Sequence, residues 1–334
     1  MIPAGASRQL RFRAHVLLIS VLIGTTLHAD DESAFSQAAD LLNQMSLAMS
    51  QMTYQGTFVY VQGSLVETMR ITHVVDENGI HERLVAETGP QREILRDASG
   101  VRWIAKDSKS MVRDPAFKRS YFPEVNVAAI EMAADYYTIA IGGLEPMAGR
   151  QGRKLSIVPR DRYRYGYTLW LEDPSGLLLK WELFENSARP LARLMFTDLR
   201  FGREVDLAEL QTSEPVEEYA THASDIPANQ ELTNALPRWA PTSLPPGFSL
   251  TAHRRQDKRT PEIFQHLIYS DGIAAVSVYV EPAVEGRDTF AGITRMGTTH
   301  AFSRRQGGLQ ITVVGDVPAI TVQEIGEAVK QNAP

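Results

Sequence analysis

The sequence predicts a mainly β protein with some α-helix, an α+β fold. We expect a large half-open antiparallel β-barrel wrapped over helices, followed by a small α+β C-terminal domain. From Thr53 to Phe201, apolar and polar residues alternate with a period of two in successive short runs, which is typical of strands with one buried face. Turn-forming residues separate these runs, so consecutive strands should lie side by side and antiparallel. A sheet with so many strands must curl or close.

The expected strands of the large domain are joined by short turns. They cover residues 54–61, 65–75, 80–87, 92–97, 101–106, 111–114, 154–159, 165–172, 177–185 and 191–199. Ahead of them, residues 34–52 carry apolar side chains at spacings of three and four, the pattern of an amphipathic helix. We expect this helix to pack on the sheet, and the alternative is a methionine-rich groove lining. A shorter helix is predicted near residues 126–137.

The N-terminus has the layout of a cleavable secretory signal. Arg8, Arg11 and Arg13 precede an apolar run from Ala14 to Gly24, and the small residue Ala29 precedes the first acidic residues. A membrane-spanning helix needs roughly 20 apolar residues, about twice the length of this run. An uncleaved anchor is therefore the less favoured alternative, and we expect export and release of a soluble mature protein.

The composition excludes several classes of function. The chain has no cysteine, which rules out disulfides, a cysteine nucleophile, cysteine-bound zinc and a lipid anchor on an N-terminal cysteine. Its 34 Lys and Arg stand against 40 Asp and Glu, and removal of the signal takes away three Arg and no acid. The mature chain then has 31 basic and 40 acidic residues, a net charge of −9. Such a charge argues against nucleic acid as a partner.

A change in composition divides the chain into domains. Residues 204–231 contain eight acidic residues and no Lys or Arg, which indicates a solvated linker. We expect a signal peptide at 1–29, a large domain at 30–203, an acidic linker at 204–235 and a small domain at 236–334. In the small domain, strands are predicted at 248–255, 263–270, 273–281, 298–305 and 309–315, with a closing helix after Pro318.

The sequence lacks the motifs of common enzymes. It has no G-x-S-x-G elbow, no phosphate-binding glycine loop and no dinucleotide fingerprint. None of the eight histidines forms an i, i+4 pair that could hold a metal. Glu172 and Asp173 are neighbouring carboxylates at a turn, without the apolar surroundings that acid catalysis would need. We expect no catalytic residue, no metal and no cofactor, and a protein that works by binding rather than as an enzyme.

The apolar faces of the large-domain strands are the candidate lipid-binding site. The candidate residues are Phe58, Tyr60, Met69, Ile71, Trp103, Tyr167, Leu169, Trp181 and Leu183. In a half-open barrel these side chains would line a concave apolar surface. The alternative is an ordinary core that the helices seal, and the sequence leaves both interpretations open.

Two further patterns concern charge. Residues 162–167 alternate Arg and Tyr, which fits a contact to an anionic headgroup or, as the favoured interpretation, a strand with solvated side chains. Basic runs at 253–259 and 304–305 in the small domain fit a solvated turn or a docking face for an acidic partner segment or an anionic lipid. The candidate partner-binding residues are Arg254, Arg255, Tyr269, Tyr279, Arg304 and Arg305.

Several stretches of this sequence resemble a known family. They are Gln55–Tyr60, Leu65–His73, Leu244–Phe248, Tyr269–Gly272, Ala275–Glu281, Gly297–Ala301 and Val313–Pro318. In this order, and over nearly the whole mature chain, they resemble the RseB/MucB family of periplasmic regulators of the sigma-E (AlgU) envelope stress pathway. The resemblance implies a large domain similar to the periplasmic lipoprotein carriers, with a small domain docked beside it.

The resemblance also implies a function. A member of this family binds the periplasmic region of a single-pass anti-sigma factor (RseA/MucA-like) and shields it from regulated proteolysis, which represses the stress response. Lipopolysaccharide or another lipid or lipoprotein ligand then releases it. The family has no catalytic residues to carry over. The alternative, supported by the large domain alone, is a periplasmic carrier chaperone for lipids or lipoproteins. Whether the protein forms homo-oligomers stays open.

Overall fold

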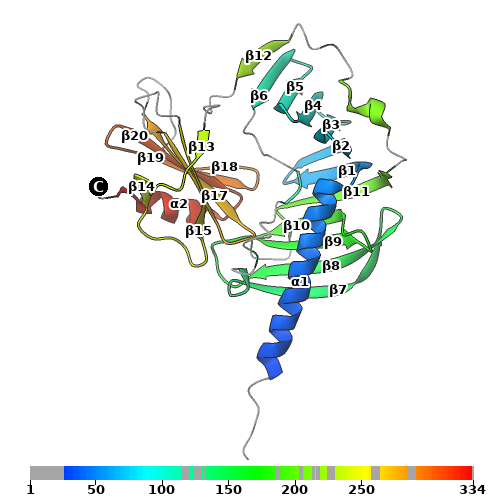
Figure 1. Ribbon diagram of the computed structural model, residues 1–334, viewed down its shortest axis with the longest axis horizontal. Coiled ribbons are helices and arrows are strands. Elements are labelled where there is room, and N and C mark those ends of the chain that lie inside the picture. Colours follow the sequence, from blue (N-terminus) through cyan, green and yellow to red (C-terminus); the bar gives the residue numbers. More distant parts are fainter. Residues whose placement is uncertain are drawn as a thin grey trace, which may run out of the picture.

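A twelve-stranded sheet and a seven-stranded sheet lie side by side in the molecule (Figure 1). This is a computed structural model. It describes residues 26–114, 121–123, 130, 133–185, 189–202, 206–212, 215, 219–223, 230–256, 264–283 and 291–332. The expected secretory signal lies outside these residues up to position 25. Within the described parts of the chain, no helix is both long and apolar enough to cross a bilayer.

The larger sheet is built from two antiparallel meanders and one parallel edge strand. Its strands are β1 (Tyr54–Gln62), β2 (Leu65–Asp76), β3 (Gly79–Ala86), β4 (Arg92–Asp97), β5 (Gly100–Ala105), β6 (Ser110–Asp114), β7 (Tyr137–Met147), β8 (Arg150–Pro159), β9 (Gly166–Glu172), β10 (Leu178–Phe184), β11 (Ala192–Phe201) and β12 (Ala220–Ala223). Their order in the sheet is β12-β6-β5-β4-β3-β2-β1-β11-β10-β9-β8-β7. The meanders are β1 to β6 and β7 to β11, and β12 adds parallel to β6 at one edge. The antiparallel pairing of β1 with β11 joins the meanders, and the two edges, β12 and β7, do not pair with each other. The predicted half-open barrel is therefore confirmed.

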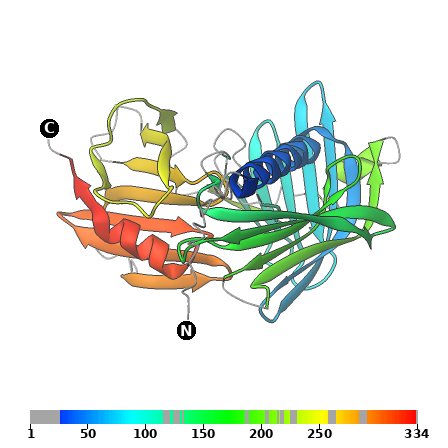
Figure 2. The same ribbon diagram turned by 90° about the horizontal axis from the view of Figure 1, so that it is seen from below.

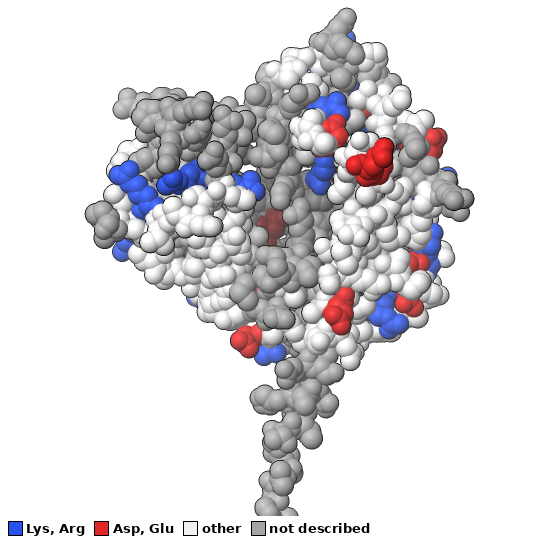
Figure 3. All heavy atoms as spheres, in the orientation of Figure 1, with Lys and Arg blue, Asp and Glu red and all other residues white. Residues whose placement is uncertain are grey.

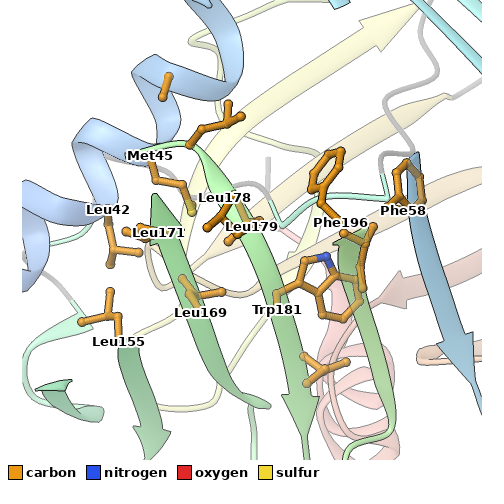
Figure 4. Packing of buried hydrophobic residues seen from close by; sticks show 14 of the residues in the cluster. Leu42, Met45, Phe58, Leu155, Leu169, Leu171, Leu178, Leu179, Trp181 and Phe196 are labelled. Atoms are coloured by element: carbon orange, nitrogen blue, oxygen red, sulfur yellow. The ribbon is translucent and has the colours of Figure 1, made fainter. Parts of the chain in front are cut away.

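Helix α1 (Thr26–Gln51) lies in the concave side of the larger sheet (Figure 2). Its buried residues Ala38, Leu42, Met45 and Ala48 belong to the same apolar core as the strands. In Figure 4 the side chains of Leu42 and Met45 are directed towards leucines of β8 and β9. The expected packing of this helix on the sheet is confirmed for these residues. The helix begins eight residues earlier than the predicted start at residue 34.

One long strand of the larger sheet was not predicted. β7 forms the sheet edge beside β8, and its register shifts between Ile141 and Leu144. Gly142 and Gly143 lie at this irregularity, and in the sequence they indicate a turn rather than a strand. Half of the residues of the short helix expected near 126–137 lie outside the described residues. Of the others, residues 134–136 form a turn and Tyr137 begins β7, so the predicted end of this helix is wrong.

The small domain combines the second sheet with a helix on one face. Its elements are β13 (Gln230–Leu232), β14 (Trp239–Pro241), β15 (Ser249–Gln256), β16 (Gln265–Ser270), β17 (Ala275–Pro282), β18 (Gly292–Met296), β19 (Thr299–Gln306), β20 (Leu309–Gly315), α2 (Ala319–Ala328) and β21 (Val329–Gln331). α2 packs on β19 and β20. Val322 and Ile325 of α2 are fully buried against Val278, Ile311 and Val313. A separate α+β domain with its own core is therefore confirmed.

The acidic stretch between the domains is more ordered than a solvated linker. It contains a short 3-10 helix, η3 (Leu207–Leu210), whose Glu209 carbonyl accepts a hydrogen bond of 2.8 Å from Arg83 on β3. Further along the chain, β12 adds to the larger sheet beside β6 and β13 adds to the smaller sheet beside β15. Short elements in this stretch therefore attach to both domains. The domain boundaries at 203 and 236 stay a prediction.

Candidate functional site

The two domains meet on the segment with alternating Arg and Tyr. Arg164 is fully buried, and its Nη1 lies 2.9 Å from Oδ2 of Asp271, which is also fully buried. The guanidinium also donates to the carbonyl of Pro246, and it lies over the ring of Tyr136 at 4.8 Å. The expectation of a strand with solvated side chains is wrong for Arg164, because the small domain covers it. Arg162, two residues earlier, is exposed.

Asp271 is saturated with hydrogen bonds. Its Oδ1 accepts from the backbone N–H groups of Ile273 and Ala274 at 2.9 and 2.7 Å, which fixes the turn after β16. Its Oδ2 accepts from Arg164 and, at 3.0 Å, from the hydroxyl of Tyr137. Burial raises the pKa of this carboxyl, while the donated bonds and the Arg164 charge oppose the rise. Asp271, a turn residue of the small domain, thus binds two residues of the large domain: Arg164, just ahead of β9, and Tyr137, at the start of β7.

A second group of contacts closes the junction near the turn between β18 and β19. The hydroxyl of Tyr165 donates to the carbonyl of Thr298 at 3.2 Å, and the Gln62 side-chain amide donates to the Thr298 hydroxyl at 3.4 Å. Gly297 has a φ of +66°, and a Cβ there would lie 2.2 Å from Oε1 of Gln62. Only glycine combines this backbone conformation with so close an approach.

A cavity of about 320 Å³ opens at the junction, with walls from both domains. Its large-domain wall is mostly aromatic and aliphatic, and its small-domain wall carries Met296, Thr298, Thr299 and Asp316. The lining residues of the large domain are Tyr60, Gln62, Leu65, Glu67, Arg92, Trp103, Tyr121, Phe122, Pro123, Tyr167, Trp181 and Leu183. In Figure 3 the described surface of both domains is mostly uncharged, with Lys, Arg, Asp and Glu scattered over it. A mainly apolar wall with a few polar groups is typical of small-molecule sites.

One ion pair stands in this apolar wall. Arg92 Nη2 lies 2.6 Å from Oε2 of Glu67 and donates to the hydroxyl of Tyr121 at 2.9 Å. The indole N–H of Trp181 donates to the carbonyl of Tyr121 at 3.0 Å. None of the residues Glu67, Arg92, Tyr121 and Phe122 was among the predicted site residues. Glu67 could have been found, because it lies on the same strand face as buried Met69 and a charge on an apolar face is unusual.

The nine predicted lipid-binding residues divide into two groups. Tyr60, Trp103, Tyr167, Trp181 and Leu183 line the junction cavity. Phe58, Met69, Ile71 and Leu169 are at most 1% exposed and belong to the core. The sequence left two interpretations open, a cavity lining and a sealed core, and each describes part of these nine residues. A lipid-binding role stays a prediction for all nine.

The six predicted partner-binding residues divide between the two faces of the smaller sheet. Strand pairing places Arg254 and Tyr279 on the face opposite α2, in one row with His266, and Arg305 lies on that same face. We call this the outer face. Arg255 and Tyr269 lie on the α2 side, as does Arg304, which donates to the carbonyls of Gly326 and Val329 at 2.8 and 2.6 Å. Arg304 therefore holds the end of α2. The candidates on the outer face are Arg254, Tyr279 and Arg305.

The carboxylates at the turn after β9 have a structural role. Glu172 accepts a hydrogen bond of 3.0 Å from the backbone N–H of Ser175 and another from its hydroxyl. Its Oε1 lies 3.5 Å from Arg150. These bonds stabilise the turn between β9 and β10. Among the described residues, no three His, Asp or Glu side chains gather as they would around a metal ion.

The fold and the cavity define a class of protein: a half-open barrel that shares a mainly apolar cavity with a small docked domain. The chain belongs to the MucB/RseB family. The family's N-terminal domain matches residues 37–214 and its C-terminal domain matches residues 233–330.

Two characterised relatives are similar over nearly their full length. The sigma factor AlgU regulatory protein MucB of Pseudomonas aeruginosa is 30% identical over 321 residues, which cover 94% of this chain and 96% of the relative. The sigma-E factor regulatory protein RseB of Escherichia coli K12 is 23% identical over 317 residues, 94% of this chain and 97% of the relative.

Solved structures agree with this assignment. A complex of Pseudomonas aeruginosa MucA and MucB contains a chain that superimposes with a TM-score of 0.65 at 27% identity, covering 89% of this chain and 100% of that one. A crystal structure of MucB gives a TM-score of 0.61 at 27% identity, with 89% and 98% covered. The two-domain arrangement is thus shared with MucB.

Proposed function

We propose that this chain is a periplasmic regulator that binds the periplasmic region of a membrane anti-sigma factor. It shields that region from regulated proteolysis and so represses a sigma-E type envelope stress response, and lipopolysaccharide or lipid-type signals release it. Family membership and the relatives named as regulators of AlgU and sigma-E support the proposal. So does the likeness to MucB crystallised with MucA(peri), at a TM-score of 0.62 and 28% identity.

The observation that carries the lipid part is the junction cavity with walls from both domains. A ligand in this cavity contacts the large domain and the small domain at once. A ligand shifts the equilibrium between two arrangements of the domains only if its affinities for them differ. A lipid that prefers another arrangement therefore changes the affinity of the chain for any partner bound across both domains. The coupling is reciprocal, so the bound partner must weaken lipid binding by the same factor.

The outer face of the small domain is the proposed partner surface. Arg254 and Arg305 place two cations on it, and Tyr279 lies between their strands on β17. Tyr and Arg are among the residue types that contribute most to binding energy at protein interfaces. Cations at this face would attract an acidic partner segment and speed its association.

The second candidate function is a carrier of lipids or lipoproteins, favoured by the apolar wall of the cavity. The two functions differ in their need for the small domain. A carrier would need the barrel lining, whereas the regulator uses the small domain both as a cavity wall and as a partner surface.

The deciding experiment is protease protection. A purified periplasmic segment of a single-pass anti-sigma factor is incubated with the protease that initiates its cleavage, with and without this chain. We expect the chain to slow cleavage and added lipopolysaccharide to restore it. Cleavage at the same rate with and without the chain would reject the regulator. Recovery of many lipoproteins and no anti-sigma factor from envelope extracts would favour the carrier.

A further inference from the structure

The interior of the half-open barrel contains a second cavity beyond the junction cavity. Its volume is about 290 Å³, and its walls come from α1 and from strands β1 to β4. It is lined by Met45, Ser46, Met49, Ser50, Tyr54, His73, Ile80, Glu82, Arg96, Phe122 and Pro123. Phe122 and Pro123 also line the junction cavity. The short segment Tyr121–Pro123 therefore forms the wall between the two cavities.

This segment fills the barrel with aromatic rings. Phe122 stacks on Phe196 at 6.0 Å between centroids and meets the edge of Phe58 at 5.6 Å. Tyr121 meets Tyr60 edge-on at 5.4 Å. These contacts are apolar and need no specific geometry, so a flexible hydrocarbon chain could make them as well. Phe58 and Phe196, which are fully buried here, would stay covered if such a chain took the place of Phe122.

The polar bonds of the segment depend on residues of the junction cavity. Among the described residues, Arg92 donates a hydrogen bond to the Tyr121 hydroxyl and Trp181 donates one to the Tyr121 carbonyl. Both donors line the junction cavity. A ligand that enters this cavity and engages Arg92 or displaces the Trp181 indole therefore weakens the attachment of the segment.

The polar groups of the two cavities are arranged along one strand. Arg92 lies in the junction cavity and Arg96 in the second cavity, with buried Ile94 between them on the same face of β4. Four residues of a strand span roughly 13 Å. Glu82, on the neighbouring strand, lies opposite Arg96. The barrel interior is thus apolar in the middle and charged towards both ends.

We propose that Tyr121–Pro123 is an internal plug, and that an acyl chain displaces it and occupies both cavities as one continuous channel. This inference rests on the lipid part of the proposed function. The junction cavity alone is at the lower end of the roughly 300–1,000 Å³ of small-molecule sites. Removal of the plug joins it to a second cavity of similar size. The site would then take the hydrocarbon of a lipid amphiphile, with its polar group near Arg92.

The absence of cysteine makes the test direct, because an introduced thiol is the only one in the chain. We would prepare Phe122→Cys and measure its rate of reaction with a maleimide, with and without tetradecanoate as the acyl probe. If the plug leaves the barrel, the probe accelerates the reaction by about tenfold or more. Val158→Cys, at an exposed position of β8, is the matched control, and its rate should not change.

A second variant tests the attachment of the plug. Tyr121→Phe removes the hydrogen bond from Arg92 and keeps the ring, so it should bind tetradecanoate several-fold more tightly than the wild type. Pro123→Cys replaces Phe122→Cys as reporter if the latter lowers the melting temperature.

The outcomes separate the inference from the function on which it rests. If tetradecanoate binds, as measured by calorimetry, but the thiol reacts at the same rate or more slowly, the plug stays in place and the inference is wrong while lipid binding stands. If neither the wild type nor Tyr121→Phe binds tetradecanoate, the inference and the acyl-chain site fail together. Protease protection without added lipid still tests anti-sigma binding by itself.

Discussion

Arg164 of the large domain and Asp271 of the small domain form an ion pair at 2.9 Å in which neither side chain is exposed to solvent. The pair exists only while the domains are docked, because each domain supplies one partner. Burial of either charge alone would cost several kcal/mol. Arg164 also lies 3.1 Å from Asp161 of its own domain, so the pair favours the domain orientation in which Arg164 gains the Asp271 carboxylate as well.

Removal of Arg164 should loosen the junction. We expect Arg164→Ala to lower the free energy of unfolding by about 3–5 kcal/mol, the usual effect of breaking a buried pair by deleting one partner. Urea denaturation measures this loss. Arg162→Ala is the matched control, because Arg162 is exposed and lies 3.6 Å from Glu324, so its loss should cost under about 1 kcal/mol. Equal effects of the two variants would contradict the role given to Arg164.

The cavity wall and the core beneath it should respond differently to truncation. Trp103→Ala removes part of the junction cavity's wall and should lower affinity for lipopolysaccharide by about tenfold or more. Phe58→Ala, in the fully buried core, should instead cost about 3–5 kcal/mol of stability. A fluorescence titration paired with thermal melting measures both quantities. If Trp103→Ala binds as well as the wild type, the cavity is not the lipid site.

Charge reversal on the outer face should weaken partner binding without unfolding the domain. We expect Arg254→Glu with Arg305→Glu to lower affinity for the acidic anti-sigma segment by about tenfold, mainly through slower association. The loss should shrink at high salt, since surface attraction is screened. Arg304→Ala is the contrasting variant and should lower the melting temperature, because it removes hydrogen bonds to the end of α2. Surface plasmon resonance at two salt concentrations would show whether association is affected.

His266 makes the stability of the small domain depend on pH. Burial, aided by the nearby Arg254 charge, lowers the pKa of His266 to about 4 from its ordinary 6.5. Between these values the unfolded chain binds a proton that the folded chain does not. The stabilisation is therefore complete above about pH 6.5 and is lost as the pH falls towards 4. His266→Gln should show a smaller fall of melting temperature from pH 7 to pH 4, and an unchanged slope would contradict the assignment.

Most of the fold could be predicted because turns and alternation are local properties of the sequence. The strands β1 to β6 begin and end within a residue or so of the predicted positions. β7 was missed because Gly142 and Gly143 interrupt its alternation at the register shift. β18 was missed because nearly all of its side chains are exposed, so it shows no apolar face.

The candidate site could be predicted only in part. Alternation correctly placed Tyr60 and Trp103 on inward faces of strands, where they line the cavity. It assigns a side chain to a face but does not show what covers that face, so the burial of Arg164 by the small domain could not be foreseen. Tyr121 and Phe122 lie in a segment with no periodic pattern. Their position depends on how the strands and α1 enclose the barrel interior, which the local sequence pattern does not show.

The way the chain passes from one sheet to the other limits how far the domains can separate. β12 is anchored on the larger sheet and ends at Ala223, and β13 is anchored on the smaller sheet and starts at Gln230. The stretch between them, fully extended, spans at most roughly 25 Å. A small domain released from Arg164 therefore remains tethered nearby, at an effective concentration in about the millimolar range. Undocking would then be a reversible intramolecular step, and the domains would dock again once the ligand has left.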